Sequence, residues 1–500
     1  AYRFTTLASE PDAENIVFRD SVIDNCESND GSRAFYATAI TSAFTFYNLT
    51  IQHVKSKSGF IFTLGHSQAI KESVLFEKCN FIDCSTNIAD NDGGGLGFWC
   101  SDQSEIIFDE CLFQQLNAGT CGGAISYTQS TRGSRKNTTL IFTNCIFDQN
   151  SAGINGSALY IDITGQLLVD QCNFTNNNCK GNQNSGAIFI TKNCRNINIE
   201  RSEFYSNTQA SAASNGNAIY FERQESLIGY VSDCTFVDCG SKGSVVYSDG
   251  VALEFISNRI SFTKPEVGAR GLHVPVSCNI HIANSSFTGC VSDNTNYGGA
   301  FTFCSVANHD NNPGLITLEN SIFENNNASN GCALLVVTND NPIIKDLTIR
   351  NHKKGTFIFS MFFTRPFDED AVIDNCIFEE NYFQNTVNSP DGGGSGIWVA
   401  QLQASTTPVT FSECTFRNNF ASTCGGAMAF GQSNTLKSVE LTYQGCTFNN
   451  NKAGSNEGGA LWINTENLLV IDDCEFISNE LEGSQSSGNA IILKERTKVI

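Results

Sequence analysis

Proline is scarce in this sequence, with 8 residues among 500, and no run of eighteen apolar residues occurs. Because proline cannot donate a ladder hydrogen bond, its scarcity is compatible with long, uninterrupted β-ladders. Without a long apolar run we expect no membrane-spanning helix in this segment. The chain opens at Ala1, with neither an initiator methionine nor a signal-peptide pattern.

Basic residues are also few. Lys and Arg number 30 against 51 Asp and Glu, which gives a net charge of −21. This balance argues against a nucleic-acid partner and against an anionic membrane surface. It is compatible with cation binding, although solubility is the simpler reason for it.

Motifs that carry common chemistries are missing. We find no phosphate-binding loop, nucleophile elbow or calcium-binding nonapeptide, and no His or Cys cluster has zinc spacing. We therefore expect no cofactor, no metal and no enzymatic activity.

The sequence instead contains one motif many times. It is Cys-x-Phe followed three residues later by Asn, as in Cys145-Ile-Phe147-Asp-Gln-Asn150. Thirteen Phe residues define it, most of them about 27 to 38 residues apart: Phe81, Phe113, Phe147, Phe174, Phe204, Phe236, Phe255, Phe287, Phe323, Phe378, Phe416, Phe448 and Phe476.

Residues at i and i+2 of a strand point to the same face, so Cys and Phe are expected to be buried together. Asn three residues after the Phe tolerates a left-handed backbone, which would bend the chain out of the strand. A second block, Gly-Gly-Ala followed by apolar residues, predicts a turn that leads into another short strand, as at Gly458–Ile463.

A unit of two or three short strands cannot bury its own apolar face, but stacked units can. The repeat therefore predicts an all-β chain folded as a parallel β-helix of roughly sixteen turns, at about 30 residues per turn. We take the right hand because it is the commoner one. A β-sandwich lacks such a fixed motif, and a propeller blade would need about 40 to 50 residues.

The Cys positions also accept Ser, which favours small buried side chains over metal ligands or nucleophiles. Three local pairs, Cys79/Cys84, Cys172/Cys179 and Cys234/Cys239, could form disulfides, and the sequence leaves this open. The predicted structural ladder comprises Cys79, Cys111, Cys145, Cys172, Cys376, Cys414, Cys446, Cys474, Phe81, Phe147, Phe416, Phe448, Asn150 and Asn419.

A longer period overlies the short one. Asp92-Gly-Gly-Gly95 returns as Asp391-Gly-Gly-Gly394, and Thr120–Ala124 returns as Thr423–Ala427, at offsets of 297 to 303 residues. We infer a duplicated unit of about 300 residues. Residues 1–74 would be the end of a preceding unit, 75–374 one full unit, and 375–500 the start of the next. Because Ile500 falls within a turn and lacks a polar cap, we expect this chain to be a segment of a longer protein.

The paired motifs Phe-x-x-Asn (Phe147–Asn150, Phe416–Asn419) and Gly-Gly-Ala-(Ile/Leu/Met) (Gly122–Ile125, Gly425–Met428) resemble the repeats of chlamydial polymorphic outer membrane proteins. Similar repeats occur in large surface proteins of trichomonad protists. The resemblance covers nearly the whole chain, and it implies a cell-surface or secreted β-helix that adheres to host cells or matrix. No C-terminal membrane barrel is visible here, and Asn and Cys are richer than expected of a bacterial protein.

We therefore expect an extracellular structural or adhesive fibre that contacts host-cell or matrix glycans or proteins, and that associates with itself end to end or laterally. The alternative is a carbohydrate-active β-helix enzyme, either a polysaccharide lyase or a glycoside hydrolase. For an enzyme, His273 and His281 near Arg270 and Asp249 are the first candidates, although surface histidines are the simpler interpretation. The adjacent acidic pairs Asp109-Glu110, Glu379-Glu380 and Asp472-Asp473 are interpreted as solvated surface.

Two further features bear on the surface. Trp99, Trp398 and Trp462 could stack on sugars, but packing under a loop is the simpler role. Six sequons permit N-glycosylation of a secreted chain: Asn48, Asn137, Asn155, Asn173, Asn284 and Asn327.

Overall fold

The structure is a computed structural model, and its residues group into two compact units, Ala1–Ala252 and Leu253–Ile500. The two units are defined by their internal contacts, and their limit does not coincide with the limits of the 300-residue repeat predicted from the sequence. The residues that it describes are 2–5, 15–28, 34–38, 43–56, 61–66, 73–86, 96–100, 105–129, 137–181, 185–210, 215–223, 228–240, 243–263, 269–276, 278–292, 299–304, 314–328, 334–338, 341–353, 358–363, 370–383, 397–401, 408–422, 424–431, 440–454, 458–464, 468–482, 488–493 and 498–499.

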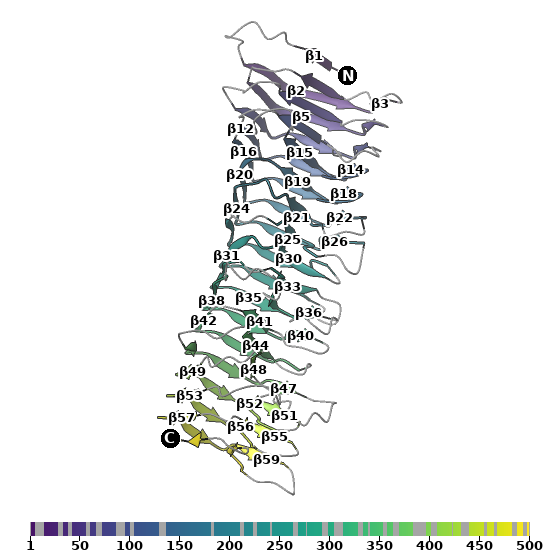
Figure 1. The fold of residues 1–500 in the computed structure, drawn as a ribbon. Coiled ribbons are helices and arrows are strands. Elements are labelled where there is room, and N and C mark those ends of the chain that lie inside the picture. Colours follow the sequence, from purple (N-terminus) through teal and green to yellow (C-terminus); the bar gives the residue numbers. More distant parts are fainter. Residues whose placement is uncertain are drawn as a thin grey trace. The chain divides into compact units, whose positions relative to one another are not determined.

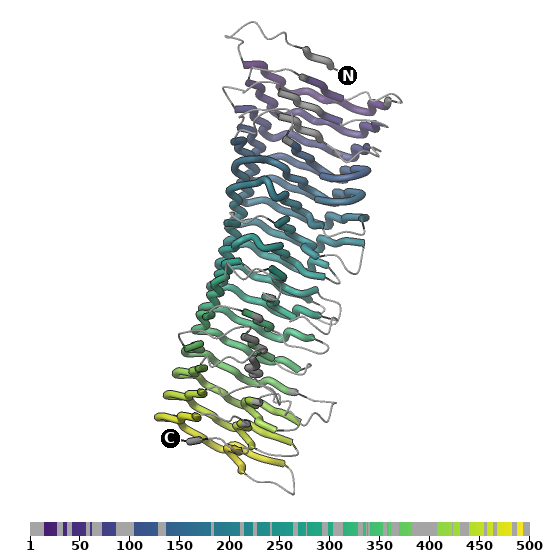
Figure 2. The backbone as a smooth tube through the Cα atoms, in the orientation of Figure 1, coloured from purple at the N-terminus to yellow at the C-terminus, as the bar shows by residue number. Residues whose placement is uncertain are grey.

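Each unit is a parallel β-helix, and one turn of the first unit shows how the sequence makes it. The turn contains four strands, one or two more than expected: β16 (Thr138–Thr143), β17 (Ile146–Asp148), β18 (Ser151–Ala152) and β19 (Leu159–Asp162). Bends at Asn144, Gln149 and Gly156, with φ of 53°, 54° and 63°, separate them. Each strand pairs in parallel and in register with its equivalent in the next turn. Figure 1 shows this stacking, and the backbone trace in Figure 2 follows the repeated path.

The strands of the first unit form three sheets, which we name after their motifs. The Gly-Gly-Ala sheet contains β1 (Tyr2–Thr5), β4 (Phe35–Thr38), β7 (Phe62–His66), β11 (Leu96–Cys100), β15 (Ile125–Gln129), β19, β23 (Ile188–Ile190), β27 (Ile219–Phe221) and β30 (Ser244–Ser248). The Cys-Phe sheet, with up to two strands per turn, contains β2 (Ile16–Asp24), β5 (Phe44–Gln52), β8 (Val74–Glu77), β9 (Asn80–Ile82), β12 (Glu105–Asp109), β13 (Leu112–Gln114), β16, β17, β20 (Gly165–Asp170), β21 (Asn173–Thr175), β24 (Asn196–Glu200), β25 (Glu203–Tyr205), β28 (Ile228–Ser232) and β29 (Thr235–Val237). The Asn sheet contains β3 (Glu27–Ser28), β6 (Lys55–Ser56), β10 (Ser85–Thr86), β14 (Asn117–Ala118), β18, β22 (Asn178–Cys179) and β26 (Thr208–Gln209).

The second unit repeats the arrangement. Its Gly-Gly-Ala strands are β33 (Arg270–Val274), β37 (Phe301–Cys304), β41 (Leu334–Thr338), β44 (Phe359–Phe363), β48 (Ile397–Gln401), β52 (Met428–Gly431), β56 (Leu461–Asn464) and β60 (Ile491–Leu493). Its Cys-Phe strands are β31 (Ala252–Ile256), β32 (Arg259–Ser261), β34 (Ile280–Ala283), β35 (Ser286–Thr288), β38 (Ile316–Glu319), β39 (Ile322–Glu324), β42 (Ile343–Lys345), β43 (Thr348–Arg350), β45 (Ala371–Asp374), β46 (Ile377–Glu379), β49 (Val409–Ser412), β50 (Thr415–Arg417), β53 (Leu441–Gln444), β54 (Thr447–Asn449), β57 (Leu468–Asp472), β58 (Glu475–Ile477) and β61 (Lys498–Val499). Its Asn strands are β36 (Val291–Ser292), β40 (Asn327–Ala328), β47 (Tyr382–Phe383), β51 (Phe420–Ala421), β55 (Lys452–Ala453) and β59 (Glu480–Leu481).

The described Gly-Gly-Ala strands number nine in the first unit and eight in the second. Each turn contributes one of these strands, so the described residues contain seventeen such strands in the two units.

The Phe residues stack as a column in the interior of each unit. Phe113 and Phe147 have ring centroids 4.8 Å apart, and Phe416 and Phe448 are also 4.8 Å apart. This distance matches the spacing of neighbouring strands. The assignment of Phe255 to this column was wrong. Phe255 lies on β31, the first of the two Cys-Phe strands of its turn, and pairs with Ile282. Ile260 on β32 occupies the Phe position, beside Phe287. The buried column accepts any large apolar side chain, so in this turn the Phe is not the residue at the column position.

The bends lie at positions other than the Asn that the sequence predicted. The left-handed residue lies two positions after the Phe, as at Gln149 and Asn418, and another lies directly before the Cys, as at Asn144. The Asn three positions after the Phe does not make the bend; Asn150 and Asn419 are buried. The polar residue that bends the chain can therefore be Gln, Asp, Glu or Ser, while the Asn has an interior role.

Some features of the sequence analysis lie outside the described residues. These are the glycine runs at 93–95 and 392–394. Among the residues that the structure does describe, no helix is long and apolar enough to cross a membrane.

Candidate functional site

The predicted ladder cysteines form a column in each unit, buried except for the half-buried Cys474. In the first unit the column comprises Cys79, Cys111, Cys145 and Cys172, and in the second it comprises Cys376, Cys414, Cys446 and Cys474. The thiol of Cys79 donates to the Phe46 carbonyl oxygen of the preceding turn at 3.3 Å and to the Glu77 carbonyl oxygen at 3.4 Å. Cys414 repeats this with Ile373 and Ser412, at 3.3 Å each. The thiols thus bind backbone carbonyls between turns.

Burial raises the pKa of Cys145 in this column well above the usual range, and it raises the pKa of Cys84, outside the column, to about 12. Because the thiolate is the nucleophilic form, such thiols are poor nucleophiles at neutral pH. The local pairs are not disulfides in the structure, since Cys79 and Cys84 each donate to carbonyl oxygens instead.

The Asn residues form a second buried column beside the cysteines. The Asn150 amide nitrogen donates to the Phe113 carbonyl oxygen at 3.0 Å and to Oδ1 of Asn177 at 3.0 Å. Oδ1 of Asn150 accepts the backbone N–H of Leu116 at 3.0 Å. Asn419 has the equivalent contacts in the second unit, with Phe378 and Asn451. Each amide therefore bonds to the turns on both sides.

His352 occupies this Asn column in the second unit, a position that the repeated motif did not predict. Its backbone N–H donates to Oδ1 of Asn381 at 3.2 Å. Its ring nitrogens lie 2.9 Å from the Asn326 carbonyl oxygen and 3.2 Å from the Phe323 carbonyl oxygen. The side chain is 1% exposed, and burial lowers its pKa to about 4. The available signal was Ile349, which takes the Phe register three residues earlier.

His281, one of the candidates from the sequence, lies in an outward row of charged side chains on the second unit. Its Nδ1 lies 2.7 Å from Oε2 of Glu254 on β31, and its Nε2 lies 3.0 Å from Oε1 of Glu319 on β38. Lys345 on β42 approaches the other oxygen of Glu319 at 2.8 Å. We call Glu254, His281, Glu319 and Lys345 the histidine row.

The electrostatics of the histidine row favour the imidazolium. Partial burial lowers the pKa of His281, but the hydrogen bonds to Glu319 and Glu254 outweigh it and raise the pKa above its ordinary value. The Lys345 ammonium, and then His281, lower the pKa of Glu319. Because the two carboxylates bind opposite edges of the ring, they do not converge on a common point. The row is therefore an ion-pair network.

The other candidates near His281 are arranged differently. Arg270 and His273 lie on β33 and are 7% and 3% exposed. Burial and then the charge of Arg270 lower the pKa of His273 well below its ordinary value. Asp249 is part of the first unit, where partial burial raises the pKa of its carboxyl. Within the second unit, the buried β33 pair is separate in sequence and sheet from the histidine row.

The adjacent acidic pairs are divided between a strand and a bend. Asp109, Glu379 and Asp472 each end a strand, and the following residue has φ of 51°, 55° and 49° respectively. Glu379 is the least exposed of them and binds Arg417, whose Nε is 2.5 Å from Oε2. This carboxylate is therefore part of an ion pair with Arg417 on the neighbouring strand.

The outward aromatic residues of the Gly-Gly-Ala sheet stack on each other. Phe189, Tyr220 and Tyr247 are buried, with successive ring centroids 4.9 and 5.0 Å apart. Trp462 is 5% exposed and packs against Cys424 and Ala429. Rings that cover each other's faces do not offer a face to a sugar. The side chains of Trp99 and Trp398 lie outside the described part of the structure.

The sequons differ in accessibility. Asn48, Asn137, Asn173 and Asn284 are exposed, while Asn155 and Asn327 are half-buried. Asn48 and Asn284 share a register in their units, since each is the left-handed residue before the Cys position, with φ of 51°. The structure thus places four of the six where a glycan would project outward.

Within the described ranges, no three His, Cys, Asp or Glu side chains are grouped so as to hold a metal ion. The comparisons with known proteins concern the fold. The family model for the right handed β-helix region matches residues 217–448, which is somewhat less than half of the chain. The match confirms the fold class and the right hand taken from the sequence. No curated protein matches the chain.

Proposed function

We propose that the chain is a structural and adhesive part of a surface or extracellular fibre, a β-helix stalk that presents loops for contact with cells or matrix. The observation that carries this proposal is the use of the interior polar side chains. Cys, Asn and His352 each bond to backbone carbonyls of neighbouring turns, so the reactive residue types are used for stacking.

The resemblance of the paired motifs to chlamydial polymorphic outer membrane proteins and trichomonad surface proteins supports an extracellular, adhesive role. Right-handed β-helix regions occur both in surface proteins and in carbohydrate-active enzymes, so the fold alone does not choose between them. The exposed sequons fit a secreted chain. Host-cell or matrix glycans or proteins are the proposed partners, with end-to-end or lateral self-association as a variant.

The experiment is a binding assay with the purified, fluorescently labelled chain on epithelial cells and on surfaces coated with matrix proteins or glycosaminoglycans. We expect saturable binding that the unlabelled chain competes away. An unrelated folded protein of equal negative charge serves as the control. Binding that does not saturate, or that the control protein equals, would overturn the adhesive role.

A second candidate is a carbohydrate-active enzyme, and one observation favours it: His281 lies between two carboxylates on an outward face. Incubation with pectin, hyaluronan and alginate, followed by detection of new reducing ends, tests this activity. Products that appear with the wild-type chain and disappear with Glu319→Gln would replace the stalk proposal. We expect no product from any of the three polymers.

A further inference from the structure

One outward column of the first unit is aliphatic over four successive turns. Leu75, Ile107, Ile141 and Leu168 lie side by side on β8, β12, β16 and β20, each in register with the next. We call these residues the aliphatic stripe. Their neighbours along each strand, such as Phe108 and Phe142, are buried, so the stripe lies on the opposite, outer face of the sheet. All four side chains are partly exposed.

The fold does not require aliphatic residues at these positions. The duplicated positions in the second unit, at offsets of 297 to 303 residues, are Val372, Thr410, Thr442 and Val470. They form the same in-register column on β45, β49, β53 and β57. Thr therefore maintains the sheet at the two central positions where the first unit has Ile107 and Ile141. At these two positions the first unit is therefore more apolar than the second, and the fold itself does not explain the difference.

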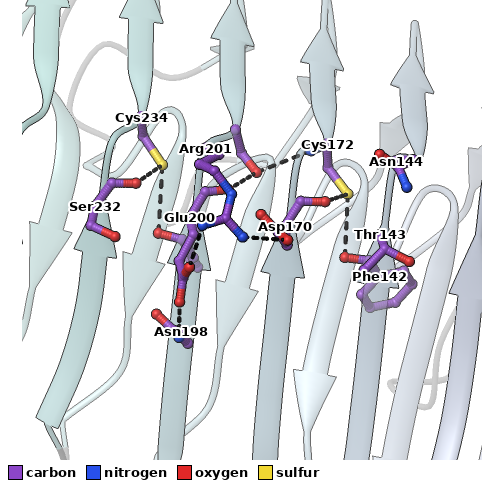
Figure 3. A network of polar contacts seen from close by, with 12 residues as sticks. Phe142, Thr143, Asn144, Asp170, Cys172, Asn198, Glu200, Arg201, Ser232 and Cys234 are labelled. Atoms are coloured by element: carbon purple, nitrogen blue, oxygen red, sulfur yellow. Dashed lines mark hydrogen bonds and ion pairs between the residues drawn. The ribbon is translucent and has the colours of Figure 1, made fainter.

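The stripe has an acidic border. Two residues further along each strand from β8 to β20, and at the bend that follows, lie four carboxylates and one cation: Glu77, Asp109, Glu110 and Asp170, with Lys78. The next two turns, at β24 and β28, continue this border with Glu200, Arg201 and Asp233. Arg201 is bound by Asp170 at 2.6 Å and by Glu200 at 3.1 Å, and Lys78 lies 3.6 Å from Glu77 and 3.8 Å from Glu110. Figure 3 shows Arg201 between Asp170 and Glu200. Both cations are thus already paired, and the border remains negative.

These features point to one occupant. We propose that the aliphatic stripe is a docking surface for a cationic amphipathic segment of a partner protein, with aliphatic side chains along the stripe and Lys or Arg along the acidic border. A negative border repels sulfated or carboxylated glycans and repels a second copy of this chain, whose net charge is −21. An aliphatic row spaced at about 4.8 Å is matched by one side of a helix, whose pitch is about 5.4 Å. This inference is independent of the proposed function, because a stalk or an enzyme could equally carry a docked partner.

The test uses the full chain and a synthetic helical peptide of Leu and Lys, with Leu recurring at every third and fourth position. A peptide of the same composition in scrambled order is the control. The matched variant is Ile107→Thr/Ile141→Thr, which installs the residues of the second unit and should leave the melting temperature unchanged. We expect the amphipathic peptide to bind the variant at least tenfold more weakly than the wild type, whereas the scrambled peptide should bind both alike.

Three results would overturn the proposal. The first is equal affinity of the amphipathic peptide for wild type and variant, which would mean that charge alone binds the peptide and that the aliphatic residues do not contribute. The second is no binding to the wild type. The third is self-association of the wild-type chain that the double substitution abolishes, since the occupant would then be a second copy.

Discussion

Asn419 shows how an amide is accommodated in the interior of these units. Its Nδ2 donates to the Phe378 carbonyl oxygen at 2.9 Å and to Oδ1 of Asn451 at 3.0 Å, and its Oδ1 accepts from Asn381. A buried polar group without partners is costly, and here Asn381, Asn419 and Asn451 each donate to the amide oxygen of the next Asn in the column. The column therefore stabilises the stack only as long as it is continuous.

We expect Asn419→Ala to lower the free energy of unfolding by about 3 kcal/mol, because it leaves neighbouring buried donors and acceptors unpaired. Asn449→Ala, on the outer face of the adjacent turn, should change it by less than about 0.5 kcal/mol. Urea unfolding followed by circular dichroism measures both. Equal effects of the two substitutions would show that the column has no special role.

His352 interrupts this column with a titratable ring. Burial lowers its pKa to about 4, whereas an unfolded histidine titrates near 6.5. Between pH 4 and pH 6.5, His352 therefore binds a proton in the unfolded chain but not in the folded chain. The contribution of neutral His352 is present above pH 6.5 and is lost as the pH falls towards 4.

We expect the wild type to lose about 3 kcal/mol of stability relative to His352→Asn between pH 6.5 and 4. The variant restores the residue type of the column and removes the titration. Thermal unfolding of both proteins across this range is the measurement. If the difference between their stabilities does not depend on pH, the neutral buried state assigned to His352 is wrong.

The residue scale also shows what a sequence can reveal. Cys, Phe and Asn columns were predictable because identical side chains recur at fixed spacing. Ile260 and His352 were not, because a column tolerates any side chain that fills the volume or bonds to the same carbonyls. The left-handed bends were misplaced by one position, since Gln, Glu and Asp bend the chain as well as Asn once a stack enforces the conformation.

At the scale of elements, bends with similar φ differ in the space around them. Gly425 opens the turn before β52 with φ of 62°, and a Cβ there would lie 2.3 Å from the Met428 carbonyl oxygen. Gly445 has φ of 63° in the bend before Cys446, where a Cβ would meet the end of the Glu413 side chain. Other turns carry Asn144 or Asn375 at the position of Gly445.

We therefore expect Gly425→Ala to destabilise the protein by about 3 kcal/mol, from a backbone clash in addition to left-handed strain. Gly445→Ala should cost about 1 kcal/mol, from the strain alone. Denaturant unfolding of the two variants makes the comparison. A smaller loss for Gly425→Ala than for Gly445→Ala would contradict the geometry of the Gly-Gly-Ala turn.

The histidine row links β31, β34, β38 and β42 across the outer face of the second unit. Because the folded-state pKa of His281 is raised, its stabilising effect is complete below about pH 6.5. The effect is lost as the pH rises through the raised pKa. Its sign is opposite to that of His352, although both are histidines in the same unit.

We expect His281→Gln to lower the melting temperature at pH 6 and to leave it nearly unchanged at pH 9. Calorimetry of wild type and variant at the two pH values is sufficient. A larger loss at pH 9 than at pH 6 would mean that the row favours the neutral ring.

At the scale of the whole molecule, the duplication of about 300 residues stays a prediction from the sequence, whereas the aliphatic stripe could not be predicted from it at all. To predict the stripe, one must know which outward residues of successive turns become neighbours. The positions of the bends set this register, and the sequence did not give them correctly. The same columns recur in both units, while the outer faces differ, as Ile107 and Thr410 illustrate. A fold with a repeated interior and a variable exterior suits a stalk that presents surfaces.

The central claim is that this β-helix functions outside the cell, as a structural and adhesive fibre. The most direct measurement is labelling of intact, unpermeabilised cells of the source organism with antibodies raised against the purified chain. We predict labelling of the cell surface or of extracellular fibres, removed by external protease. Labelling that appears only after permeabilisation and survives external protease would contradict the account.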